Sequence, residues 1–147
     1  MRLSLLAVLF GWAATAHAAE VHDCADAETG AEFIAEPWRD NTRAFSQGDV
    51  RLILLDRIEP AAGAYHLMLL SPPFDDFGQP TCHVVSFAGE IGYPQMTLEG
   101  MTSGYDPARG LLFGVLVDVG LDVAEKRTLV LELNQATGEL KAKEVQR

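Results

Sequence analysis

The sequence lacks the motifs that identify a chemical activity. It has no Gly-x-Ser-x-Gly turn of the kind that presents a hydrolase serine, and no glycine-rich loop for a phosphate or a dinucleotide. No histidines stand at the i, i+4 helical spacing of a zinc site, and no acidic run has the regular ligand spacing of a calcium loop. We therefore expect no cofactor and no dedicated metal site.

Long apolar segments are also scarce, and the longest uncharged one stands at the start of the chain. Residues 3–14 are mostly apolar, follow Met1 and Arg2, and precede the small residues Ala16 and Ala18. This order is typical of a secretory signal peptide cleaved after Ala18. The run is shorter than the roughly 20 residues that span a bilayer, and no later segment is long and apolar enough to do so. We expect residues 1–18 to be removed and the mature chain not to insert into a membrane.

Other export routes are excluded by what surrounds this run. Arg2 has no neighbouring arginine, so the twin-arginine pattern is missing, and Cys24 stands too far from the cleavage site to carry a lipid. The short, alanine-rich signal is typical of bacteria and predicts a Sec-type route to the periplasm or the medium. The remaining residues, 19–147, suffice for one domain with a hydrophobic core.

Basic residues are few. The chain has 11 Lys and Arg against 21 Asp and Glu, a formal net charge of −10. Nucleic-acid binders carry a basic face, and adhesion to anionic lipid needs basic residues as well, so neither partner is expected. The charge serves solubility or, alternatively, an acidic face that meets a basic partner. Residues 19–36 contain six acidic residues and no base, so the stretch 19–40 is typical of a solvated, acidic leader.

Cysteine is limited to Cys24 and Cys82, and there is no Cys-x-x-Cys motif. In an oxidising compartment two such residues predict one structural disulfide. It would stabilise the fold by about 4 kcal/mol in the chain-entropy model and tie the acidic leader to the domain. A redox-active pair and an intermolecular link are the alternatives.

Most of the mature chain has the residue pattern of β-strands. Apolar or alternating runs of strand length occur at residues 50–58, 64–70, 81–87, 111–119, 127–134 and 139–145. Asp106–Gly110 and Asn134–Gly138 each begin with an Asx residue and end with glycine, a pattern of tight turns between antiparallel strands. Residues 101–145 are therefore expected to form an up-and-down meander. A short helix is expected between Asp26 and Trp38.

Together these runs predict a mainly β fold of about seven antiparallel strands. Apolar residues on both faces of the central runs require a sheet that is covered on both sides. An antiparallel sandwich and a small, partly open up-and-down barrel both satisfy this requirement. The sequence leaves the two architectures open.

The segment from Ser71 to Pro80 is the most unusual in composition, because three prolines and a glycine surround aromatic and acidic residues. We expect a stiff loop. A loop of this kind loses little entropy on binding, and aromatic residues on it are typical anchors for a partner. The candidate recognition residues are Phe74, Asp75, Asp76 and Phe77. In the alternative interpretation Phe74 and Phe77 fold down over the ends of the core.

Two weaker candidate sites depend on strand pairing. His66 and His83 would be neighbours if their strands pair, and a third ligand could complete a zinc site. Ser71 with a histidine and Asp75 could form a hydrolase-like set. Ordinary strand residues are the alternative in both cases. Trp38 is expected to close one end of the core or, with Arg39, to form a contact patch.

The sequence thus favours an exported, non-catalytic binding module of the bacterial envelope. Its expected partner is a protein of unknown identity or a small apolar ligand, bound by the 71–80 loop or by an apolar interior. A small hydrolase-like or metal-dependent enzyme remains an alternative, as does a structural subunit that joins an assembly through an edge strand. The oligomeric state is left open.

Overall fold

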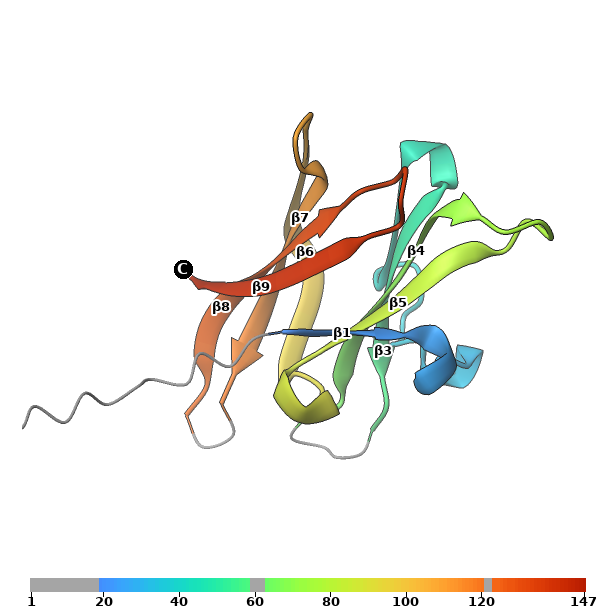
Figure 1. Cartoon of the computed structure of the whole chain (residues 1–147). Coiled ribbons are helices and arrows are strands. Elements are labelled where there is room, and N and C mark those ends of the chain that lie inside the picture. Colours follow the sequence, from blue (N-terminus) through green and yellow to red (C-terminus); the bar gives the residue numbers. More distant parts are fainter. Residues whose placement is uncertain (1–18, 59–62, 121–122) are drawn as a thin grey trace, which may run out of the picture.

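The computed structural model describes residues 19–58, 63–120 and 123–147, so the expected signal peptide lies outside the described residues. Over this part of the chain, two antiparallel sheets pack face to face (Figure 1). The five-stranded sheet has the order β1-β5-β4-β3-β2, and the four-stranded sheet has the order β6-β7-β8-β9. The predicted mainly β, antiparallel fold is confirmed, and of the two expected architectures the layers match the sandwich.

The strands have the following bounds. The five-stranded sheet contains β1 (Glu20–Asp23), β2 (Thr42–Phe45), β3 (Val50–Asp56), β4 (Tyr65–Phe74) and β5 (Pro80–Ser86). The four-stranded sheet contains β6 (Gln95–Asp106), β7 (Gly110–Val119), β8 (Glu125–Leu133) and β9 (Leu140–Gln146). The helical elements are single 3-10 turns, η1 (Cys24–Asp26), η2 (Ala31–Phe33), η3 (Ser46–Gly48) and η4 (Ala88–Glu90). No helix in the described residues has the length and hydropathy to cross a bilayer.

The meander expected between residues 101 and 145 lies within the four-stranded sheet, and its turns have the predicted chemistry. Asp106 Oδ1 accepts a hydrogen bond from the Ala108 N–H at 2.8 Å, and Asn134 Oδ1 accepts one from the Ala136 N–H at 3.0 Å. Gly110 and Gly138 take φ values of +87° and +76°. These are left-handed conformations in which a glycine has no steric penalty.

The core lies between the two sheets and follows the alternation of the strands. Leu129, Leu131 and Leu133 of β8, predicted to share an inward face, are each 0% exposed. They pack in one cluster with residues of the facing sheet such as Leu52 and Leu69. Each fully buried leucine stabilises the fold by roughly 2–3 kcal/mol relative to an exposed one. This burial fixes which face of each strand points inward.

The acidic leader is tied to the outer face of the five-stranded sheet by the predicted disulfide between Cys24 and Cys82, whose Cα atoms are 5.5 Å apart. The segment is not a solvated tail, because its apolar residues cover a second, smaller cluster on that face. The cluster consists of Leu55, Met68 and Val84 under Cys24, Ala27, Phe33 and Ile34.

The short helix expected between Asp26 and Trp38 is replaced by the isolated turns η1 and η2. The reason is visible in the backbone pairing. Ile34 forms a bridge with Leu55, and the Ala35 N–H donates to the Leu54 carbonyl at 2.9 Å. These bonds to the sheet hold residues 34 and 35 extended, so a continuous helix cannot form.

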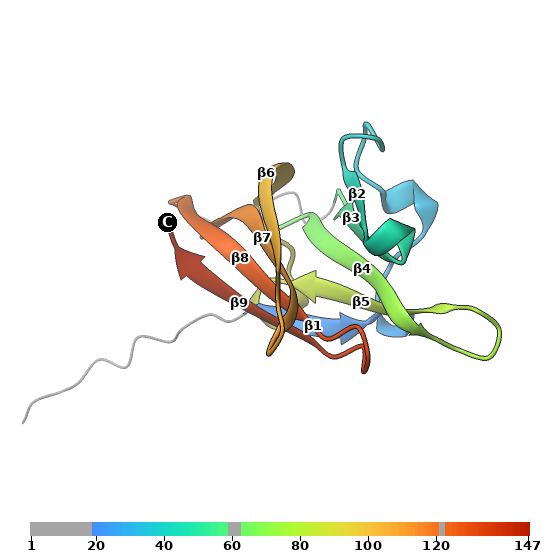
Figure 2. The same cartoon turned by 90° about the horizontal axis from the view of Figure 1, so that it is seen from above.

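Strands β1 and β2 were not expected from the sequence. Each has four residues, and β1 pairs with the distant β5, placing Glu20 opposite Ser86. The two sheets approach one another where β9 lies beside β1 (Figure 2). Near this side, the Tyr93 hydroxyl donates to Glu144 at 2.9 Å, and Arg127 contacts the same carboxylate at 3.4 Å. The C-terminal strand is thereby bound to both layers.

Candidate functional site

The segment 71–80 forms the end of a β-hairpin rather than the irregular loop that its prolines predicted. Strand β4 continues to Phe74 and β5 begins at Pro80, so only residues 75–79 form the tip. Pro72 and Pro73 are tolerated because the β4–β5 register shifts between Ser71 and Phe74, and prolines fit at such irregularities. The hairpin projects beyond the body of the sandwich (Figures 1 and 2).

The tip of this hairpin is held in one conformation by Asp75. Its Oδ1 atom accepts hydrogen bonds from the N–H groups of Phe77, at 2.9 Å, and Gln79, at 2.8 Å. The backbone N–H of Asp75 donates to the Gln79 carbonyl at 2.9 Å, and Gly78 takes a φ of +80°. Asp75 therefore acts on its own turn, as Asx residues do.

The root of the hairpin is braced by the other sheet. The Nε2 atom of His83 lies 2.9 Å from the carbonyl oxygen of Gly138, in the turn between β8 and β9. Because a carbonyl only accepts, His83 must donate from Nε2. The Thr81 hydroxyl donates to the Pro73 carbonyl at 2.9 Å across the hairpin. The tip therefore extends from a part of the hairpin that contacts both sheets.

The aromatic residues at the tip point into solvent. Phe77 is 90% exposed and Phe74 is 44% exposed. The alternative interpretation, that both fold down over the core, does not describe this arrangement. Asp76 beside them is exposed and makes no hydrogen bond or ion pair within the described residues. The structure therefore brings Phe74, Asp76 and Phe77 together on a stiff projection, with Asp75 shaping it.

His66 and His83 are not brought together, although their strands pair. The register places His66 opposite Ser86 and His83 opposite Leu69, which puts the two histidines on opposite faces of the sheet. His66 is buried, and its Nδ1 atom lies 2.9 Å from the Ser86 hydroxyl oxygen. No group of three or more metal-binding side chains occurs in the residues that the structure describes.

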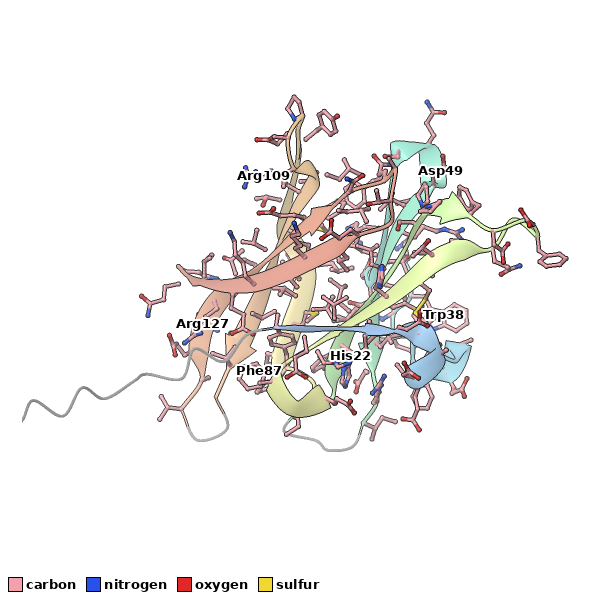
Figure 3. All side chains as sticks on the ribbon, in the orientation of Figure 1. His22, Trp38, Asp49, Phe87, Arg109 and Arg127 are labelled. Atoms are coloured by element: carbon pink, nitrogen blue, oxygen red, sulfur yellow. A yellow bond between two sulfur atoms is a disulfide. The ribbon has the colours of Figure 1, made fainter. Side chains whose placement is uncertain are left out.

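The other weak candidates are also separated. Ser71 is fully buried, and its hydroxyl has no hydrogen-bond partner in the described part of the chain, whereas Asp75 lies at the exposed tip. The hydrolase-like set is therefore not assembled. Trp38 is 51% exposed, so it does not close an end of the core. Figure 3 shows its position away from the centre of the sandwich.

Sequence reasoning missed the contact between His66 and Ser86 and the polar residues around it. Alternation along a strand shows which residues share one face of that strand. Only the register between β4 and β5 shows that the face of β4 that carries His66 is the same side of the sheet as the face of β5 that carries Ser86. Comparisons of this chain with protein-family models, curated proteins and solved structures gave no match. The site is therefore interpreted from its own geometry.

Proposed function

We propose that this protein is an exported binding module that recognises a protein partner through the tip of the β4–β5 hairpin. The observation that supports this proposal is the exposure of Phe77 on a turn whose conformation is already fixed. A side chain of this size that enters a pocket on a partner contributes about 2 kcal/mol or more through burial. Because Asp75 and the root contacts order the tip beforehand, little of that gain is lost to conformational entropy.

The chemistry around Phe77 indicates what the partner offers. An aromatic ring needs an apolar pocket, and the neighbouring Asp76 carboxylate has no partner of its own within the described residues. The chain as a whole carries a net charge of −10. A pocket with a basic rim would match both features and would speed the encounter of the two proteins.

A protein partner is favoured over a small apolar ligand because the space between the sheets is filled. The inward residues of both layers, such as Leu52, Phe113 and Leu131, are packed in one cluster and are almost completely buried. An apolar ligand in this interior would have to displace packed side chains, which costs stability.

The export part of the proposal rests on the N-terminal sequence pattern together with the disulfide, which persists in oxidising compartments. It is tested by the mass of the protein recovered from its own cells. We expect a chain that begins at Ala19 and is lighter than the reduced form by the hydrogens lost in the disulfide. A chain that retains residues 1–18 would contradict export by cleavage.

The binding surface is tested by placing a photo-crosslinking phenylalanine analogue at Phe77 in the protein's own cells. We expect one discrete adduct, which the second change Phe74→Ser weakens. The matched control carries the analogue at Tyr105, an exposed aromatic residue that is 68% exposed in β6. Tyr105 should give no adduct of that mass.

The combined change Phe74→Ser and Phe77→Ser separates binding from folding. Phe77 is almost fully exposed and Phe74 is half-buried, so the free energy of unfolding should fall by only about 1 kcal/mol. Urea unfolding of the purified variant measures this. Equal crosslinking at positions 77 and 105, no adduct at either position, or gross unfolding of the double variant would refute the hairpin as a recognition surface.

A further inference from the structure

A polar cluster lies on the outer face of the five-stranded sheet, beside the part that the leader covers. Leu55, Met68 and Val84 form the apolar part, and the same face continues with His66 and Ser86, both 2% exposed. His22 of β1, which pairs with Val84, faces the same side, as does Arg57, two residues beyond Leu55. Figure 3 shows His22 low on this sheet, away from the projecting hairpin.

Several nitrogen atoms of this cluster are buried without a hydrogen-bond partner. Within the described residues these are Nε and Nη2 of Arg57, and Nε2 of His22, which lies 3.6 Å from a carboxylate oxygen of Glu20. Buried polar groups in native proteins are nearly always paired, and an unpaired cation is among the most costly exceptions. Such a group calls for an occupant that the protein atoms do not supply.

A small cavity of about 20 Å³ lies where these atoms meet, lined by His22, Asp26, Ala27, Arg57, Ser86 and Glu90. A volume of this size accommodates about one water molecule or the oxygen atoms of a small group, but not a whole metabolite. The remainder of a larger ligand would therefore lie outside the cavity, beside the exposed residues Asp26 and Glu90.

We propose that Arg57, with His22 and Ser86, binds the carboxylate of a small zwitterion such as a free α-amino acid. The Nε and Nη2 atoms lie on one edge of the guanidinium plane and match the two oxygens of a carboxylate in a bidentate contact. The Ser86 hydroxyl, on the same cavity wall, can donate to a carboxylate when Nδ1 of His66 carries the ring proton and donates to Ser86 Oγ. His22 Nε2, which lies 3.6 Å from a Glu20 oxygen, donates when it carries the proton.

The acidic residues at the rim select for a zwitterion rather than a simple anion. Neither Asp26 nor Glu90 forms an ion pair with Arg57 in the described residues, although both line the cavity. Their charge disfavours an isolated anion and favours a ligand with an ammonium group next to its carboxylate. Burial and the charges of Arg57 and His22 lower the pKa of His66 to about 4, so His66 stays neutral at pH 7 and adds no competing charge.

The first experiment follows the arginine Nε–H signals of the oxidised mature protein by nuclear magnetic resonance during addition of glycine, acetate or methylammonium. We expect a saturable shift of the Arg57 signal with glycine and a weaker one with acetate. The exposed residues Arg39 and Arg51 serve as controls and should not respond. No saturable shift at Arg57, an equal shift at the control residues, or an equal response to methylammonium would overturn the proposal.

Variants then test the bidentate contact. Arg57→Lys keeps the charge but loses the planar donor edge, so glycine should bind at least about tenfold more weakly in calorimetry. Arg51→Lys is the matched control and should bind as the parent does. Glu59, an acidic residue two positions beyond Arg57, lies outside the described residues. Glycine binding that appears only in a Glu59→Gln variant would show that the chain's own carboxylate fills the cavity, and would overturn the proposal.

Discussion

At the scale of single residues, the surroundings of His66 strongly lower its pKa. The ring is buried against Ser86, and its pKa is lowered from the usual 6.5 to about 4, first by burial and then by the charges of Arg57 and His22. The folded state therefore holds His66 neutral at a pH where the unfolded chain protonates it. Stability that is fully present above pH 6.5 is lost as the pH falls toward 4.

We predict that the free energy of unfolding decreases by roughly 2 kcal/mol between pH 7 and pH 5 because of this histidine. Urea unfolding at both pH values measures the decrease. The variant His66→Gln cannot titrate, so its stability should depend much less on pH over this interval. An equal decrease in the variant would assign the effect to other groups and contradict the prediction.

At the scale of the elements, the β4–β5 hairpin depends on the turn between β8 and β9. Gly138 accepts the hydrogen bond from His83, and a Cβ atom at position 138 would lie 2.9 Å from Pro73 Cδ and 3.2 Å from the Thr81 hydroxyl oxygen. The turn and the root of the hairpin are thus packed without space between them. The hairpin is held by the opposite layer as well as by its own strand pairs.

We predict that Gly138→Ala destabilises the fold by about 2–3 kcal/mol, through the left-handed φ and the contact with Pro73. Gly78→Ala is a matched control, because Gly78 has a similar φ of +80° and nothing within 4 Å of the added Cβ. It should cost only about 1–2 kcal/mol. Thermal unfolding measures both, and equal losses would show that the turn and the hairpin root are not coupled.

At the scale of the whole molecule, the disulfide joins the leader to the outer face of the five-stranded sheet. Cys24 and Cys82 are 58 residues apart in the sequence. We predict that replacing both by alanine lowers the free energy of unfolding by about 4 kcal/mol. Urea unfolding of the variant and of the oxidised parent measures the loss.

Proteolysis of the same variant adds a local measurement. Residues 24–34 should be cleaved faster than in the parent, because only the small apolar cluster around Leu55 and Met68 and the backbone bridge between Ile34 and Leu55 then hold them on the sheet. Unchanged stability together with unchanged protection of this segment would mean that the apolar contacts alone hold the leader.

The features that the sequence predicted are the local ones. Alternation of Leu129, Leu131 and Leu133 set the inward face of β8, and the Asx and glycine residues of two turns fixed the meander. The four-residue strands β1 and β2 were missed because short, polar strands depend on partners rather than on their own pattern. For β1 that partner is distant in the sequence.

The candidate site shows the same division. Composition alone identified Phe74 and Phe77, since aromatic residues among prolines are unusual. Their exposure and the hydrogen bonds of Asp75 needed the folded hairpin. The cavity at Arg57 was not predicted. It depends on the register of three strands, and the sequence alone does not show that a buried nitrogen atom lacks a hydrogen-bond partner.

The pairing of β1 with β5 has a consequence for the order in which the molecule is completed. The first strand emerges first during synthesis, yet its docking place does not exist until Ser86 has been made. Until then Cys24 has no Cys82 to pair with, and its thiolate can instead exchange with a disulfide of another molecule to form a mixed disulfide. The N-terminal strand can therefore join the sheet only after β5 has been made, so the disulfide must also form after that point.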